Sequence, residues 1–427
     1  MHFRSGRPVR NSAAGLFKFE GNPVSQHFAF VCLPALGHLN PVLAVAETLV
    51  SRGHRVTIPT AAAHRERVEA IGAAAPLYTS PLLELAAPAR MAARAQGQAP
   101  EMNPVSVFRM FFQEAVDTFP LIEELLDGDR PDVLIYDQLS WAGWLLADKW
   151  RLPHVRSYPS MAANEHYSMW RGHFDTAEDP EGTAAAGEMI SKARAELGLP
   201  PMDLFGFDIH LPDLAVAFMT RSFQHAGETF DERFHFVGPC LGSRPSNTTW
   251  QPPAGDLPLV YVSLGTTYNQ QLGFYRAVLD AFRDEPCHVV LAIGGQVDPA
   301  DLGEVPANVE LHAHAPQLEI LAHASVFITH CGMGGTQEGL NFSVPMIGVP
   351  QMPEQQINAD RMAELGFGRR ILPAEVTAER LRTAVFEVLA DPAIRSRLAE
   401  VRSEIHHSGG AVRAAEVLEL AAGTPAV

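Results

Sequence analysis

The chain has 427 residues, of which 47% are hydrophobic and 19% charged, and its formal net charge is −17. This length exceeds what a single hydrophobic core usually supports, so two domains are expected. The acidity argues against binding to nucleic acid or to an anionic membrane surface, because both carry phosphates that repel a negative protein. A small cluster of hydrogen-bond donors can still bind phosphate inside an acidic protein.

Residues 1–26 carry several basic side chains and no continuous apolar stretch, and we interpret them as a flexible leader. No later segment is long and apolar enough to span a bilayer. The cysteines do not show the spacing of a metal site, and most lie in apolar runs, where a thiol is usually a small buried hydrophobe. They are Cys32, Cys240, Cys287 and Cys331. These features favour a reducing, cytoplasmic location.

Segment 27–240 alternates between short apolar runs, typical of buried parallel strands, and amphipathic stretches. Strands are predicted at 27–33, 55–59, 132–136 and 154–158. Helices are predicted from Pro41, a residue that suits the first turn of a helix, and over about 142–150. This succession of βαβ units indicates a first doubly wound domain.

The proline-rich segment 241–258 is interpreted as an interdomain linker, and a second βαβ series follows over 259–395. Its predicted strands are 259–263, 288–293, 325–329 and 346–349, and its predicted helices are 274–282, 317–323, 336–341, 355–365 and 378–390. The last residues, 396–427, are predicted to be helical and to pack back toward the first domain. The expected fold class is α/β, with two Rossmann-like domains facing each other across a cleft.

A glycine-rich turn follows the predicted strand 325–329, and its helix is expected to open at Thr336. Such a turn lets backbone N–H groups approach a pyrophosphate, and the helix dipole adds positive charge. His330 and Thr336 can add donors, and Glu338 can accept hydrogen bonds from a ribose. The candidate residues are His330, Gly332, Gly334, Gly335, Thr336 and Glu338. The pattern is not G-x-G-x-x-G, so by itself it fits a tight strand-to-helix turn nearly as well.

Two titratable residues follow strands of the first domain: His38 after 27–33, and Asp137 at the end of 132–136. Because open α/β sheets bind ligands at the carboxyl ends of their strands, these side chains are expected to meet there. A neutral histidine can take the proton of an attacking hydroxyl, and a carboxylate on its other nitrogen fixes the tautomer. Taken singly, each residue is better explained as a loop or helix-capping side chain.

Five short motifs occur in order along nearly the whole chain after residue 26. They are Gly37-His38-Leu39-Asn40-Pro41, Val262-Ser263-Leu264-Gly265-Thr266, Ala315-Pro316-Gln317-Leu318, the glycine turn, and Glu354-Gln355-Gln356-Ile357-Asn358-Ala359. Together they resemble the UDP-dependent glycosyltransferases with the GT-B fold, and among these the actinobacterial macrolide glycosyltransferases most. The resemblance implies inverting transfer of a hexose, glucose in the first instance, from a UDP-sugar to a hydroxyl of an apolar acceptor such as a macrolide, flavonoid or other polyketide.

The resemblance also implies residue roles, with His38 as general base and Asp137 as its partner. Gln317 would bind the nucleobase edge and Glu338 the ribose. The pyrophosphate would be held by Thr266, His330, Gly332, Gly334, Gly335 and Thr336, and the transferred sugar by Glu354 and Gln355. The UDP-sugar is a co-substrate, no other cofactor is expected, and no Asp-x-Asp metal motif occurs in a suitable place.

Two positions depart from the family pattern. His314 stands where a tryptophan usually stacks on uracil, and Glu354 stands where aspartate is common. A smaller stacking ring and a longer carboxylate leave open a dTDP-deoxysugar donor and a hexose other than glucose. A nucleotide-sugar epimerase and a non-catalytic nucleotide-sugar-binding auxiliary protein are further alternatives, and the pairing of His38 with Asp137 speaks against both.

Two apolar clusters are candidates for the acceptor side. Met110 and Phe111 belong to the first, which is at least as well explained as protein core. Met161 and Trp170 belong to the second, which follows a strand end and mixes polar with aromatic residues, as a pocket wall does. Neither cluster identifies the acceptor, and nothing in the sequence decides between a monomer and a homodimer.

Overall fold

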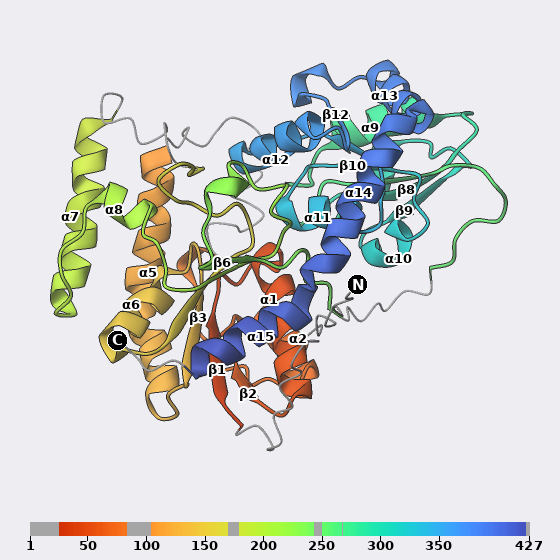
Figure 1. Cartoon of the computed structure of the whole chain (residues 1–427). Helices are drawn as coiled ribbons and strands as arrows, with labels where there is room; N and C mark the ends of the chain where they lie inside the picture. Colours follow the sequence, from red (N-terminus) through yellow and green to blue (C-terminus); the bar gives the residue numbers. More distant parts are fainter. Residues whose placement is uncertain (1–24, 83–103, 170–178, 243–249, 267, 424–427) are drawn as a thin grey trace, which may run out of the picture.

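The computed structural model of the chain describes residues 25–82, 104–169, 179–242, 250–266 and 268–423 (Figure 1). These residues form two six-stranded sheets, with the orders β2-β1-β3-β4-β5-β6 and β12-β11-β10-β7-β8-β9. Adjacent strands are parallel throughout, and in both sheets the order reverses beside the first strand. The predicted fold class, two doubly wound α/β domains, is confirmed.

The first sheet contains strands β1 (His27–Val31), β2 (Arg55–Thr57), β3 (Val133–Asp137), β4 (His154–Tyr158), β5 (Ala215–Ala217) and β6 (Phe234–Phe236). The second contains β7 (Leu259–Ser263), β8 (His288–Ala292), β9 (Val309–His312), β10 (Val326–Thr329), β11 (Met346–Gly348) and β12 (Gly368–Arg370). Eight of these strands lie where the sequence predicts them, with ends that agree within two residues. The sequence analysis does not predict β5, β6, β9 and β12; β6, β9 and β12 carry histidine or charged side chains within their short runs.

The helices that accompany the first sheet are α1 (Leu36–Ser51), α2 (Arg65–Ala70), α5 (Pro104–Asp127), α6 (Trp141–Trp150), α7 (Pro180–Glu196) and α8 (Leu204–Asp208). Those of the second half are α9 (Leu272–Phe282), α10 (Gln317–Leu321), α11 (Met333–Asn341), α12 (Pro353–Glu364), α13 (Ala378–Ala390), α14 (Pro392–Ser408) and α15 (Gly410–Ala422). Within the described residues no helix has the length and apolarity needed to cross a membrane.

The first helix begins earlier than its proline predicts. α1 starts at Leu36, so Pro41 lies inside the helix rather than at its first position. Pro41 has no N–H to donate to the Gly37 carbonyl, and the space around Gly37 is open within 4 Å of where a Cβ would lie. Because the helix starts this early, His38 lies in its first turn, close behind the end of β1, rather than in a loop.

The alternation of side chains along β1 divides the first domain into two layers. Phe28 and Phe30 pack with α1 and α15, whereas Ala29 and Val31 pack with α5 and α6 on the other face. All four residues are buried, as expected for a parallel sheet covered on both faces. The free thiols Cys32, Cys240, Cys287 and Cys331 are buried as well.

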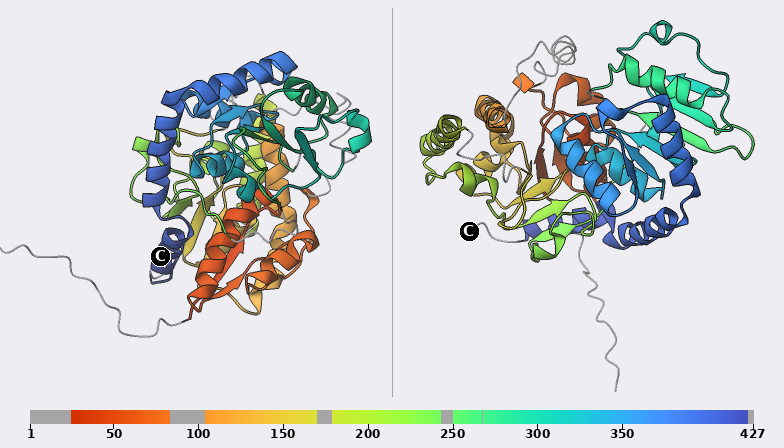
Figure 2. Two further views of the ribbon diagram at one scale, coloured as in Figure 1. Left: turned by 90° about the vertical axis from the view of Figure 1, so that its right-hand side faces the viewer. Right: turned by 90° about the horizontal axis from the view of Figure 1, so that it is seen from above.

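The chain returns to the first domain at its end. α14 and α15, dark blue in Figures 1 and 2, run along the outside of the molecule until α15 lies on α1. Ala414, Val417 and Leu418 of α15 belong to the hydrophobic core of the first domain. Glu419 adds an ion pair to Arg52, 2.8 Å away, and a contact to His54 Nε2 at 3.1 Å.

Most of the segment predicted as a leader, and the middle of the predicted linker, lie outside the described residues. Where the linker resumes, Trp250 is buried in the core of the second domain, with its ring 5.9 Å from that of His323. This segment is therefore anchored to the second domain before β7 begins.

The packing of α15 yields a stability prediction. Leu418→Ala should cost about 2–5 kcal/mol, because it leaves a cavity in the core of the first domain. The matched control is Leu420→Ala on the same helix, whose side chain is 64% exposed and whose removal should cost less than about 0.5 kcal/mol. Urea unfolding followed by circular dichroism measures both. Equal midpoints for the two variants would show that α15 does not support this core.

Candidate active site

The structure brings His38 and Asp137 together at the carboxyl edge of the first sheet. His38 Nδ1 lies 2.7 Å from Asp137 Oδ2, and Asp137 Oδ1 accepts a hydrogen bond from the Leu139 N–H at 2.8 Å. A carboxylate only accepts hydrogen bonds, so Nδ1 of His38 carries the hydrogen and the neutral ring has its lone pair on Nε2. Asp137 is 1% exposed and His38 21% exposed, so the histidine is the member of the pair that a ligand can reach.

The environment of His38 adjusts its proton affinity. Burial lowers the pKa of His38, but the charge of Asp137, the hydrogen bond to it and the charge of Glu354 together outweigh burial. The pKa of His38 is therefore raised above its ordinary value. A histidine in this setting is a stronger base, and its protonated form is stabilised by the adjacent carboxylate.

The glycine turn has a different boundary from the predicted one. α11 begins at Met333, with Gly332 as its N-cap, so Gly334 and Gly335 lie within the first helical turn, and the prediction that Thr336 opens the helix is wrong. Nothing lies within 4 Å of where a Cβ of Gly334 would be, so this end of the helix is open. The first N–H groups of α11 have no helical partners, which makes its N-terminus a suitable place for phosphate.

The His330 ring lies so close to two backbone positions that only glycine fits there. A Cβ at Gly265 would lie 2.5 Å from His330 Cε1, and a Cβ at Gly332 would lie 2.6 Å from His330 Nε2. Both positions therefore need glycine to leave room for the imidazole ring. Burial lowers the pKa of His330 to about 4, with the Ser263 carbonyl opposing the shift. The ring is thus neutral near pH 7 and can offer one N–H to a phosphate, without a charge.

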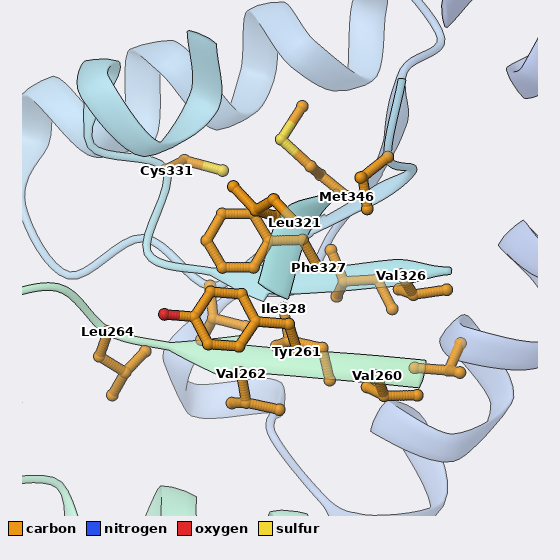
Figure 3. Close-up of a cluster of buried hydrophobic side chains, with 14 of the residues drawn as sticks. Val260, Tyr261, Val262, Leu264, Leu321, Val326, Phe327, Ile328, Cys331 and Met346 are labelled. Carbon is orange, nitrogen blue, oxygen red and sulfur yellow. The ribbon is translucent and has the colours of Figure 1, made fainter. Parts of the chain in front are cut away.

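The residues assigned to base and ribose touch each other. The Gln317 side-chain amide donates to Glu338 Oε2, and the Tyr261 hydroxyl donates to Gln317 Oε1 at 3.1 Å. In Figure 3 the Tyr261 ring lies against Phe327, and its hydroxyl points toward the side of Leu264, where β7 has ended. Stacking on Phe327 holds the Tyr261 ring, and the Tyr261 hydroxyl in turn positions the Gln317 side chain.

Glu354 reaches from the second domain to the first. Its Oε1 accepts hydrogen bonds from the Ser160 hydroxyl at 2.9 Å and from the Asn358 amide at 2.6 Å. Ser160 follows β4, and Glu354 is in the first turn of α12, so the carboxyl ends of the two sheets meet at this contact. Burial raises the pKa of Glu354, while the bonds from Asn358 and Ser160 and the charge of His38 oppose that rise.

Other predicted donor residues hold the turn itself or lie apart. Thr336 is fully buried, and its hydroxyl donates to the Gly332 carbonyl at 3.1 Å, so it is already engaged within the turn. Gln355 is buried, and its side-chain oxygen accepts from the Gln351 N–H at 2.9 Å. Thr266 and His314 are exposed, in the turns after β7 and β9. Contacts of these four residues with a nucleotide-sugar stay predictions.

The acceptor candidates do not gather in one place. Met110 and Phe111 are half-buried on α5, and Phe111 packs against the core of the first domain. Met161 is 2% exposed, in a core cluster that contains residues of both domains, and therefore offers no open face to a ligand. Trp170 lies outside the described residues.

Three residues that shape the site, Ser160, Asn358 and Tyr261, are not predicted from the sequence. Asn358 was visible as the residue one helical turn after Glu354, and its amide also donates to the Cys331 carbonyl at 3.0 Å, so it joins α12 to the glycine turn. Ser160 was visible as a polar residue just after a predicted strand. Tyr261 carried no signal, because its place inside a strand is that of an ordinary core residue. Among the described residues there is no group of three His, Cys, Asp or Glu that could hold a metal ion.

Comparisons with known proteins identify the family to which the chain is related. The family model of the erythromycin biosynthesis protein CIII-like C-terminal domain matches residues 276–419. The demethyllactenocin mycarosyltransferase of Streptomyces fradiae is 39% identical over 406 residues, which are 94% of this chain and 87% of that protein. An NDP-glycosyltransferase of Bacillus licheniformis is 38% identical over 398 residues, 92% of this chain and 97% of that protein.

A solved structure extends the agreement to three dimensions. The crystal structure of the calicheamicin glycosyltransferase superposes with a TM-score of 0.83 at 34% identity, over 94% of this chain and 100% of that one. Identity and coverage of this extent indicate common descent of both domains, not of the C-terminal domain alone. The chain therefore belongs to the family of GT-B glycosyltransferases that includes these three proteins.

Proposed function

We propose that this enzyme transfers glucose, with inversion, from UDP-glucose to a hydroxyl of an apolar acceptor such as a macrolide, flavonoid or other polyketide. The observation that carries the proposal is the 2.7 Å contact between His38 and Asp137 at the carboxyl edge of the first sheet. The names of two relatives, which refer to demethyllactenocin and calicheamicin, support this class of acceptor.

In the proposed reaction His38 Nε2 takes the proton of the acceptor hydroxyl as its oxygen attacks the anomeric carbon. The new bond from oxygen to carbon forms on one face of the sugar. The bond from the anomeric carbon to the phosphate oxygen breaks on the opposite face, and UDP leaves with the bonding electrons. Asp137 stabilises the imidazolium that results, which keeps the proton on His38 through the transition state.

The leaving group would lie at the N-terminus of α11. The unpaired N–H groups of its first turn and the neutral His330 ring would stabilise the negative charge that develops on UDP, so we propose that no metal ion is required. Glu338 would accept from the ribose hydroxyls, and Glu354 with Gln355 would bind hydroxyls of the sugar.

A dTDP-deoxysugar is the second candidate donor. It is favoured by exposed His314 in place of a stacking tryptophan, and by a relative named as a mycarosyltransferase. A panel of UDP- and dTDP-sugars, each offered with several polyketide acceptors and read by mass spectrometry, decides between them. A mass gain of one hexose only with UDP-glucose supports the first donor, whereas gain only with dTDP-sugars would replace it. No product with any pair would favour an auxiliary protein.

Replacing the base should stop transfer without harming donor binding. We expect His38→Ala to lower kcat by about 10²- to 10⁴-fold, because the acceptor hydroxyl loses its proton acceptor. UDP affinity, measured by calorimetry, should stay within about twofold, since the nucleotide would bind the other domain. Turnover at the wild-type rate in this variant would rule out His38 as the base.

The pH dependence of the reaction should follow the raised pKa of His38. Only the neutral ring accepts a proton, so kcat/KM should fall as pH decreases through that pKa, above the ordinary value of about 6.5. Asp137→Asn removes the negative charge that raises the pKa, so the acid limb should move to lower pH while kcat decreases. Rate profiles between pH 5 and 9 measure both effects. An unmoved acid limb in Asp137→Asn would contradict the coupling.

Glu338 should determine nucleotide affinity. Its loss removes a carboxylate acceptor, and one hydrogen bond to such a group has a net value of about 1.5–3 kcal/mol, so Glu338→Ala should weaken UDP binding by at least roughly 10- to 100-fold. Glu319→Ala is the matched control, because Glu319 is an exposed carboxylate on neighbouring α10. If calorimetry shows the same UDP affinity for both variants, Glu338 does not bind the ribose.

A further inference from the structure

Helix α12 contacts the first domain at both of its ends. At its N-terminal end Glu354 accepts from Ser160. Near its C-terminal end the Arg361 guanidinium donates to three backbone carbonyls of the first domain, those of Ser222 at 2.8 Å, Phe223 at 3.1 Å and Gln224 at 3.5 Å. Arg361 thus binds one short loop of the first domain, residues 222–224, across the domain boundary.

The 222–224 loop also makes contacts with the second half of the chain that do not involve Arg361. The Phe223 side chain is fully buried in the core cluster that contains most of the second domain. The Ser222 N–H donates to Glu404 of α14 at 3.1 Å. Arg361 also pairs with Glu364 at 2.9 Å, and its side chain is only 15% exposed. The guanidinium therefore lies largely buried between α12 and the 222–224 loop, and this loop is also joined to α14.

Inside the first domain the same loop is joined to Ser160. The Gln224 side chain accepts from the Ala162 N–H at 2.9 Å and donates to the Ala162 carbonyl at 3.1 Å. Ala162 is two residues from Ser160, whose hydroxyl donates to Glu354. These contacts form a closed ring. Arg361 of α12 binds the 222–224 loop, Gln224 of this loop binds Ala162, and Ser160, two residues before Ala162, binds Glu354 of α12.

We propose that Arg361 is a positioning residue that acts through this ring, and holds the Glu354 carboxylate at the place where the transferred sugar would bind. The proposal rests on the function proposed above, in which Glu354 contacts sugar hydroxyls. With both ends of α12 fixed to the first domain, Glu354 keeps one position relative to His38 as well as to the phosphate turn. Arg361 would therefore influence which sugar is accepted, although it lies at the opposite end of the helix.

The test compares Arg361→Met with Arg370→Met. Methionine keeps an apolar side chain and removes the donors. Arg370 is the matched control, because it pairs with Asp360 of the same helix at 2.9 Å from within the second domain. We expect Arg361→Met to lower kcat/KM for UDP-glucose by about tenfold or more, since small displacements of reacting groups are costly. Selectivity for UDP-glucose over UDP-galactose, its epimer at one hydroxyl, should fall as well, while UDP affinity stays within about twofold.

A double-mutant cycle with Ser160→Ala tests the ring itself. If Arg361 and Ser160 act through one connected set of contacts, the double variant should lose little more sugar selectivity than either single variant. Additive losses would overturn the proposal, and so would equal kinetics for Arg361→Met and Arg370→Met. A fall in UDP affinity that matches the fall in turnover would also overturn it, because it would show damage to the second domain. A wild-type enzyme that transfers no sugar would overturn the proposed function instead, and with it this inference.

Discussion

The geometry of this enzyme depends on one partly buried hydrogen bond, from His38 to Asp137. It requires that β1 and β3 be neighbours in a parallel sheet, so that their carboxyl ends meet at one edge. It also requires that α1 begin at Leu36, because only then does the first helical turn place the imidazole beside the end of β3. The orientation of the His38 ring therefore depends on both the pairing of β1 with β3 and the start of α1.

The second domain also has a histidine just after a strand, His330, but the ring of this histidine is neutral near pH 7. His330 has a pKa of about 4 because it is buried without a nearby negative charge, whereas His38 keeps a raised pKa beside Asp137. Two histidines that follow central strands of the two sheets, β1 and β10, thus differ in proton affinity. One can take up a proton from the acceptor, and the other can approach a diphosphate without competing for that proton.

Much of the fold was predictable from sequence because its central strands are long apolar runs with distinct turns. The short strands β6, β9 and β12 escaped prediction because histidine or charged side chains interrupt their apolar pattern, and β5 escaped it as well. The His38–Asp137 pair was predictable from two strand ends. The contact between Ser160 and Glu354 was not, because it joins residues 194 positions apart whose meeting depends on how the domains are arranged. Likewise, Gly265 and Gly332 suggested a phosphate turn, but the structure shows that the His330 ring also requires them.

The position of α15 affects how the protein is made. Val417 and Leu418 belong to the core of the first domain, yet the ribosome adds them only after the whole second sheet. At about 5–20 residues per second, the first domain waits roughly 10–35 s after its own segment is complete before this helix exists. During that interval the surface of α1 that α15 will cover is exposed to solvent. The first domain is thus completed only after the second has been synthesised, and until then its uncovered core is exposed to aggregation and to chaperones.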